Sequence, residues 1–275
     1  MPRRSRSVFD KLGIDPLVVP RGTPEKRQAA ELVANLKFAQ RSSNFLFRGL
    51  DRADYELKPS ISRSRNNGAT YDPTDEKILL KIIQTEGMMF TDRSDLSDLD
   101  LLALAQHFGA PTRLLDWTTN PLVALYFAIF TGKKIDEDID GVVYIYKSQN
   151  EEYVREKCNL NTTDNKKPLF PERIFSGKVR FIFPRFVDAR IRNQNGLFSI
   201  QEDPQVSFAE NCDKKRLSYM IVPKEAKVAL ARYLYGLGIT HDFIMPGFAG
   251  FCETLGYRHH YNVGILSRHL EAEDR

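Results

Sequence analysis

The stretch Leu101–Phe130, LLALAQHFGAPTRLLDWTTNPLVALYFAIF, holds two apolar segments joined by a polar one. The first segment follows Ser97 and Asp98, either of which can cap a helix, and it ends at a glycine and a proline. The second begins at Asn120 and Pro121, a capping residue followed by a proline at the first helical position. Because residues 122–130 are apolar on every side, we expect this second helix to be buried.

Polar and aromatic side chains lie between the two helices, at His107, Thr112, Arg113, Asp116, Trp117 and Thr118. Charged groups between buried helices must be paired or line a cleft, since an unpaired buried charge is costly. One interpretation is an ion pair between Arg113 and Asp116 that locks a turn. The other is a cleft wall, which the imidazole of His107 favours, as does the N-terminus of the second helix, where anions bind readily.

The composition is that of an ordinary globular protein, with 275 residues, 42% hydrophobic and 28% charged. The formal net charge of +4 permits binding of a nucleotide or a nucleic acid but does not require it. Cys158, Cys212 and Cys252 lie far apart and lack metal-ligand spacing, so we expect reduced thiols, a cytoplasmic location and no metal. Neither a secretory signal nor a membrane span is expected, since no apolar run approaches about 18 residues.

Short strands and amphipathic helices follow one another along the chain, and no repeat or flexible linker divides it. Strands are expected at residues 45–47, 142–146, 179–183, 197–200 and 218–222. A helix beginning at Thr74 is expected to have Ile78, Leu79, Ile82 and Ile83 on its apolar face. These elements predict a single-domain α+β fold, with helices packed around a small mixed or antiparallel sheet. We place a basic N-terminal arm at residues 1–22, the domain at 23–265 and a polar C-terminal tail at 266–275.

The strand at residues 45–47 is followed at once by Arg48 and Gly49. An arginine at a strand end can project into a cleft, while the glycine lets the backbone approach a ligand closely. The planar guanidinium suits a phosphate or a carboxylate. The alternative is an internal ion pair of Arg48 with Asp51 or Asp116.

Three motifs give the chain its family resemblance: Phe47-Arg48-Gly49, the segment AQHFGAPTRLLDWT at residues 105–118, and Arg190-Ile191 followed by Gln194, Gly196 and Phe198. With these motifs the chain resembles the FRG domain family, named after phenylalanine, arginine and glycine. The resemblance extends over about residues 40 to 255, so the domain at 23–265 is expected to be one FRG domain. The family occurs largely in bacteria and their mobile elements and has no well-established activity.

A weaker, partial resemblance concerns residues 116–128, DWTTNPLVALYFA, which are similar to the Ser-Thr-Ser strand and following helix of ADP-ribosyl transferases. Those enzymes use NAD, so the resemblance implies NAD as a substrate. It implies a catalytic set of Arg48, His107, Arg113, Asp116, Gln194 and Glu202, and nucleotide contacts by Arg48, Trp117, Thr118 and Asn120.

In such chemistry Arg48 would bind the pyrophosphate, while Trp117 and Thr118 would orient the nicotinamide ribose. Gln194 or Glu202 would hold a ribose hydroxyl and stabilise an oxocarbenium-like transition state. The chain departs from those enzymes in one respect, because no Glu-x-Glu or Gln-x-Glu marks its last strand.

Two other functions stay open. The first is a nucleic-acid-processing effector, with His107 as base and Arg48 or Arg113 clamping a phosphate, which salt-sensitive binding would identify. The second is a non-catalytic sensor or interaction module, with a protein partner, in a stress or phage-defence system. All three hypotheses predict that Arg48, His107, Arg113, Asp116 and Gln194 converge in the fold.

Overall fold

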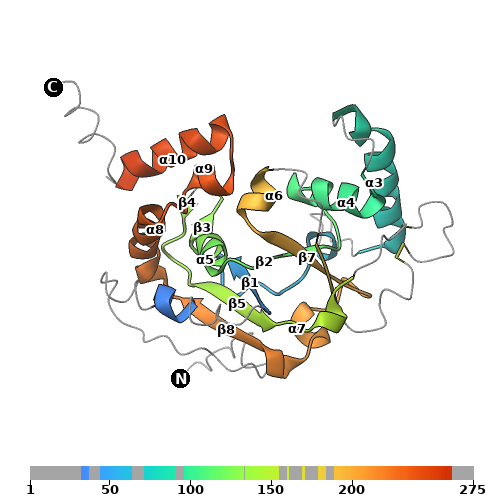
Figure 1. Cartoon of the computed structure of the whole chain (residues 1–275), viewed down its shortest axis with the longest axis horizontal. Coiled ribbons are helices and arrows are strands. Elements are labelled where there is room, and N and C mark those ends of the chain that lie inside the picture. The colour runs from blue at the N-terminus through green and yellow to red at the C-terminus, as the bar shows by residue number, and fades with distance from the viewer. Residues whose placement is uncertain are drawn as a thin grey trace, which may run out of the picture.

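A six-stranded sheet forms the centre of the computed structural model, which describes residues 32–36, 44–63, 71–90, 96–132, 134–154, 160, 169–170, 179–183 and 189–261. Every neighbouring pair of strands is antiparallel (Figure 1). The strands lie in the order β6 (Val179–Ile182), β7 (Gly196–Gln201), β2 (Leu115–Thr118), β1 (Phe45–Leu50), β5 (Gly141–Lys147) and β8 (Leu217–Val222). Two short strands, β3 (Phe130–Thr131) and β4 (Lys134–Ile135), pair separately.

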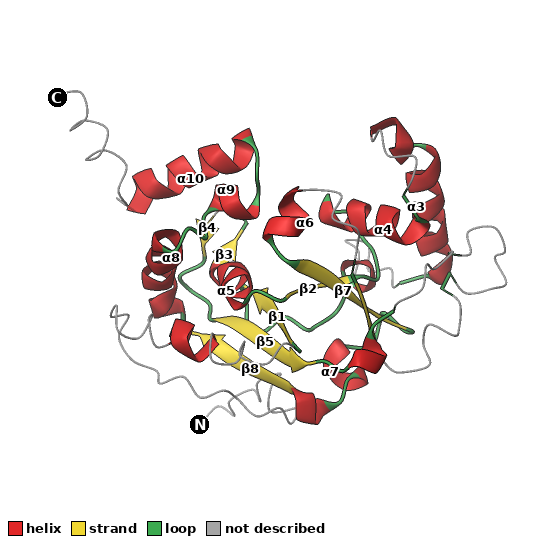
Figure 2. Cartoon of the chain, viewed as in Figure 1, coloured by secondary structure: helices red, strands yellow, loops and turns green. Residues whose placement is uncertain are grey.

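One face of the sheet is covered by two separate groups of helices (Figure 2). Over β1, β5 and β8, a core that includes Phe47 and Met220 joins the sheet to α5 (Pro121–Ile129) and α8 (Lys227–Gly236). Over β6 and β7, a core that includes Phe198 joins it to α3 (Pro73–Thr85) and α4 (Asp98–His107). Phe47 pairs with Thr118, and Phe198 pairs with Asp116, so both cores lie on one face.

The opposite face carries a third core around Trp117, Tyr146 and Phe208, the last from α7 (Phe208–Asn211). Three further helices complete the helix-covered side: α6 (Ala189–Asn193), α9 (His241–Ile244) and α10 (Phe248–Tyr261). Short 3-10 helices span Ser60–Ser62, Gly87–Phe90, Asn150–Glu152, Lys214–Arg216 and Lys224–Ala226. The described chain therefore has the predicted α+β fold, with an antiparallel sheet.

Two glycines let α5 lie close against the sheet. A Cβ on Gly49 would sit 1.8 Å from the carbonyl oxygen of Ala124, and one on Gly141 would sit 1.9 Å from that of Ala128. Any larger residue would push the helix away from β1 and β5. Gly49 therefore serves the contact between β1 and α5.

The ends of α4 and α5 are those that the sequence predicts. Ser97 caps α4 through a hydrogen bond from the backbone of Asp100, and Gly109 follows the helix with a φ of +93°. The side chain of Asn120 caps α5 by accepting from the backbone of Leu122. The Asn120 side chain thus occupies the N-terminus of α5, the place where the sequence suggested that an anion could bind.

Two expectations about local structure were wrong. Residues 115–118 do not lie in a turn locked by Arg113 and Asp116 but form β2, a central strand followed by α5, as the resemblance at residues 116–128 implied, and Leu115 and Trp117 bury their side chains in the core. In α3, Ile78 and Ile82 are 51% and 43% exposed, whereas Glu76 is buried. The helix turns its charged Glu76 inward because a buried arginine lies there, as shown below.

The N-terminal arm at residues 1–22 and the tail at 266–275 lie outside the described residues. None of the helices in the described part of the chain combines the length and the hydrophobicity that crossing a membrane would require.

Candidate functional site

The site lies where β1 and β2 separate. These neighbouring strands are in register only at Phe47 and Thr118, and the next residues of β1 diverge from β2. The side chain of Arg48 bridges the gap, because its Nη1 donates to the backbone oxygen of Asp116 at 2.5 Å and to Oδ2 of Asp116 at 3.2 Å. A side-chain hydrogen bond from Arg48 thus connects β1 to β2 where the two backbones no longer pair.

The side chain of Arg48 is only 12% exposed, and its Nε has no hydrogen-bond partner among the described residues. Burial lowers the pKa of Arg48 from its ordinary value, and the charge of Asp116 opposes that shift. The ordinary pKa of arginine is so high that the group stays charged at neutral pH. Arg48 is therefore a fixed cation with little exposure to solvent.

Asp116 is the open partner of this pair, with a side chain that is 56% exposed. Nε2 of Gln106 donates to Oδ2 of Asp116 at 3.2 Å, and Oε1 of Gln106 accepts from the hydroxyl of Thr112 at 2.6 Å. Because Thr112 is buried, it fixes which end of the Gln106 amide faces the carboxylate. A chain of hydrogen bonds thus orients Asp116.

These groups face a cavity of about 310 Å³, which we call the first cavity. It lies between the two helix groups, with α4 and α5 on its sides. A volume of this order suits a small molecule. Its lining comprises Phe47, Arg48, Gly49, Gln106, His107, Gly109, Asp116, Trp117, Thr118, Val123, Phe127, Arg190 and Gln194.

Thr118 and Gln194 line the first cavity but already bond to other parts of the chain. The hydroxyl of Thr118 donates to the backbone oxygen of Gln194 at 2.6 Å and accepts from the backbone of Asn120. Nε2 of Gln194 donates to the backbone oxygen of Ile244 at 3.0 Å. Their bonds tie β2, the turn before β7 and α9 together, so these residues shape the cavity.

Trp117 lines the first cavity, but its ring belongs to the core. The residue is 2% exposed, its ring packs against Phe181 and Phe208, and its indole N–H donates to the hydroxyl of Ser199 at 2.9 Å. A satisfied, buried indole is not available to stack on a ribose or a base. The nucleotide contact expected of Trp117 therefore does not fit this geometry.

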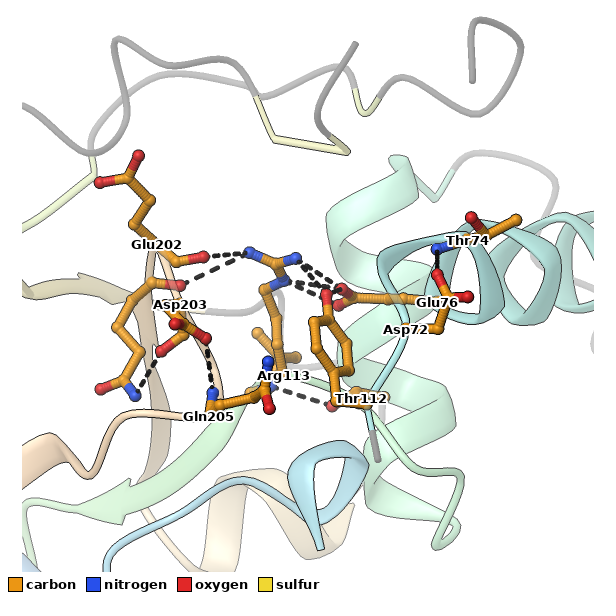
Figure 3. Close-up of polar contacts among 11 residues, drawn as sticks. Asp72, Thr74, Glu76, Thr112, Arg113, Glu202, Asp203 and Gln205 are labelled. Carbon is orange, nitrogen blue, oxygen red and sulfur yellow. Dashed lines mark hydrogen bonds and ion pairs between the residues drawn. The ribbon is translucent and has the colours of Figure 1, made fainter. Parts of the chain in front are cut away.

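Arg113 lies outside the first cavity, in a sealed cluster (Figure 3). Its Nη2 lies 2.6 Å from Oε2 of Glu76, and the two side chains are 8% and 1% exposed. Nη2 also donates to the hydroxyl of Tyr71, and Nη1 to the backbone oxygen of Glu202 at 3.2 Å. The expected pair of Arg113 with Asp116 was wrong, because Arg113 pairs with Glu76, whereas Asp116 pairs with Arg48.

Glu202 and Asn120 also lie outside the first cavity. Glu202 takes part in the Arg113 cluster through its backbone, and its carboxylate points away from Arg113 in Figure 3. Asn120 is occupied as the cap of α5. Of the residues selected from the sequence, the first cavity therefore brings together Arg48, His107, Asp116, Trp117, Thr118 and Gln194.

Several residues that line the first cavity were not among the site residues selected from the sequence, and two of them have polar side chains: Gln106 and Arg190. A weak signal existed for both. Gln106 is a polar residue beside His107 in an apolar helix, and Arg190 begins the third motif. Their role becomes visible only when α4 and α6 are placed beside the sheet.

Within the part of the chain that the structure describes, no cluster of three or more His, Cys, Asp or Glu side chains could hold a metal ion. The polar groups in the first cavity are instead arginines, amides, an imidazole and a carboxylate. This set suits an organic anion such as a phosphate ester, since arginine binds phosphate through directed N–H groups.

Comparison with known proteins identifies the segment that carries most of this site. Residues 43–137 match the family model described as the FRG domain. No curated protein and no solved structure among those compared matches the chain. The matched segment contains β1, α4, β2 and α5, and hence Arg48, Gln106, His107 and Asp116. The chain carries an FRG domain, which this match places at residues 43–137.

Proposed function

We propose that the first cavity binds a phosphate-bearing nucleotide and that the protein cleaves NAD, by hydrolysis or by ADP-ribosyl transfer. One observation carries the proposal: an arginine whose side chain is only 12% exposed, and whose Nε has no partner among the described residues, lies beside a half-exposed carboxylate in a cavity of small-molecule size. Arg190 adds a second cation to the same lining.

Arg48 is the phosphate-binding group in this proposal. The backbone oxygen of Asp116 holds Nη1, so the guanidinium is oriented before a ligand arrives. Preorganisation of this kind lowers the entropic cost of binding. Arg190, from α6, lines the same cavity and would bind the other part of a pyrophosphate.

Asp116 is the residue that acts on the ribose in this proposal. The bond between ribose C1′ and the nicotinamide nitrogen breaks, and its electron pair leaves with nicotinamide. The carboxylate stabilises the positive charge that develops on the ribose. Water or an acceptor hydroxyl then forms a new bond to C1′, and its proton passes to His107 or Asp116. Asp116 takes the role expected of Glu202, which lies outside the first cavity.

Such a reaction would consume NAD and would suit an effector in bacterial stress or phage defence. The support for this context is the FRG domain itself, which occurs largely in bacteria and their mobile elements.

Thermal unfolding with NAD, ADP-ribose, ATP or a short RNA, combined with an assay of nicotinamide release, tests the proposal. A ligand at 100 times its dissociation constant adds about 2.7 kcal/mol to the free energy of unfolding, which raises the midpoint. We expect NAD to stabilise the wild type and to release nicotinamide, and both effects to be lost in Arg48→Gln.

Arg52→Gln is the matched control, because Arg52 follows the same strand, pairs with Asp54 and does not line the first cavity. It should behave as the wild type does. Stabilisation by RNA alone, weakening steeply with salt, would contradict the proposal and would favour a nucleic-acid effector.

A non-catalytic sensor is the second candidate, and one observation favours it. Three residues that line the first cavity already form side-chain hydrogen bonds within the chain, as structural residues do: Gln106, Thr118 and Gln194. A sensor would be stabilised by a nucleotide without releasing nicotinamide. The same two measurements therefore separate the sensor from the enzyme.

A further inference from the structure

A second cavity of about 470 Å³ lies between α5 and α10. Most of its wall is aromatic or aliphatic, and charged groups enter the lining only at Arg190 and Glu253, apart from the imidazole of His107. The apolar part of the lining comprises Phe108, Tyr126, Phe127, Phe130, Met245, Pro246 and Ala249.

Three residues line both cavities, namely His107, Phe127 and Arg190. The two cavities are therefore neighbours, and a ligand that extends past these shared residues would occupy both. Its anionic part would lie beside Arg48, and its apolar part would lie beyond Phe127. The two cavities together thus fit a molecule with one charged and one apolar end.

The walls of the second cavity are held in place by contacts within the chain. The hydroxyl of Tyr126 is hydrogen-bonded to Nδ1 of the fully buried His241, and the ring centroids of Tyr126 and Phe130 lie 4.6 Å apart. A Cβ on Gly250 would sit 1.8 Å from the backbone oxygen of Met245, so this glycine lets α10 lie close to the backbone at Met245. The second cavity is therefore largely preformed.

We propose that the second cavity binds the adenine base of the nucleotide whose phosphates lie beside Arg48 and Arg190. The inference rests on the proposed function, because a reaction at Asp116 places the nicotinamide ribose in the first cavity. Adenine is then the part of NAD that remains for the second cavity. A flat base gains most from aromatic walls, to which it presents its π-face.

Calorimetric titration with AMP and with ribose 5-phosphate tests this assignment, since the two ligands differ only in the base. We expect AMP to bind the wild type about tenfold more tightly, because only AMP has a base that can stack on the aromatic walls of the second cavity. Ala249 is exposed and lines the second cavity, so the indole of Ala249→Trp should fill it. This variant should bind AMP no better than ribose 5-phosphate, with ribose 5-phosphate unaffected.

Cys252→Trp is the matched control, since Cys252 is exposed on the same helix and lines neither cavity. It should keep the advantage of AMP, and its unfolding midpoint checks that an added indole on α10 is tolerated. An advantage of AMP that survives in Ala249→Trp overturns the assignment, as does equal binding of both ligands by the wild type.

The outcome is separable from that of the proposed function. If AMP binds more tightly than ribose 5-phosphate but NAD releases no nicotinamide, the proposed NAD reaction is wrong and the proposed adenine site is supported. If nicotinamide is released and AMP has no advantage, the base site alone fails. Absence of AMP binding to the wild type overturns the base site whatever NAD does.

Discussion

Arg48 and Arg113 each pair with a carboxylate that is distant in the sequence, but the two pairs have opposite surroundings. The pair of Arg113 and Glu76 is sealed, with side chains that are 8% and 1% exposed. In the other pair Arg48 is 12% exposed, whereas its partner Asp116 is 56% exposed and lines a cavity. A sealed pair can only hold the fold together, whereas an open pair can also meet a ligand.

The sealed pair is saturated with partners. Arg113 contacts the hydroxyl of Tyr71, the carboxylate of Glu76 and two backbone oxygens, and its guanidinium lies 4.9 Å from the ring centroid of Phe170. Among the described residues, Arg48 forms hydrogen bonds through Nη1, to the backbone oxygen and the carboxylate of Asp116. The difference in saturation indicates which arginine is structural and which is available.

The largest expected effect on stability comes from breaking the sealed pair. Glu76→Gln leaves the buried charge of Arg113 without its counter-ion, which should cost about 3–5 kcal/mol of unfolding free energy. Urea unfolding measures the loss, with the exposed Glu86→Gln at the end of α3 as a control that should change little. A loss as small as that of the control would mean that the Arg113 cluster is not structural.

A double variant, Glu76→Leu with Arg113→Met, should recover most of that stability. Replacing a buried ion pair by apolar residues of similar volume is often neutral or stabilising, since the desolvation of both charges is avoided. We expect the double variant to unfold within about 1–2 kcal/mol of the wild type. If it is no more stable than Glu76→Gln, the hydrogen bonds to Tyr71 and to the backbone matter more than the charges.

Asp116→Asn should change stability far less, because a half-exposed pair contributes only about 0–1 kcal/mol. The variant keeps the backbone oxygen that holds Nη1 of Arg48. In the proposed reaction, nicotinamide release by this variant should nevertheless fall sharply, since the carboxylate charge proposed to stabilise the transition state is gone. A stability loss equal to that of Glu76→Gln would erase the contrast between the two pairs.

The sequence predicted local features well, because their causes are local. The caps at Ser97 and Asn120 and the turn at Gly109 depend on residues within one helical turn. The α+β class followed from the spacing of apolar residues. The choice of Arg48, His107, Asp116 and Gln194 came from their motifs, and all four line the first cavity.

Pairing over long distances was predicted only in part. An ion pair of Arg48 with Asp116 was one of the alternatives that the sequence left open, and the structure confirms it. Arg113 was paired with Asp116 because they are three residues apart, but its partner Glu76 lies 37 residues away on α3. The apolar pattern of α3 likewise predicted its buried face wrongly, since the buried position of Glu76 is set by Arg113. Periodicity shows that a helix has two faces, but the rest of the fold decides which one is covered.

The smallest expected effect concerns Gln106, which orients the open pair without carrying charge. Gln106→Ala removes the bond to Asp116 at 3.2 Å and should cost only about 0.5–1.5 kcal/mol, as one hydrogen bond does. Asp116 then keeps its charge but loses its fixed direction, so nicotinamide release should fall while NAD binding by Arg48 persists. Gln106→Glu should be more harmful to activity, because a second carboxylate beside Asp116 repels it. Equal NAD cleavage by wild type, Gln106→Ala and Gln106→Glu would show that the direction of Asp116 is irrelevant, and the open pair would then act through Arg48 alone.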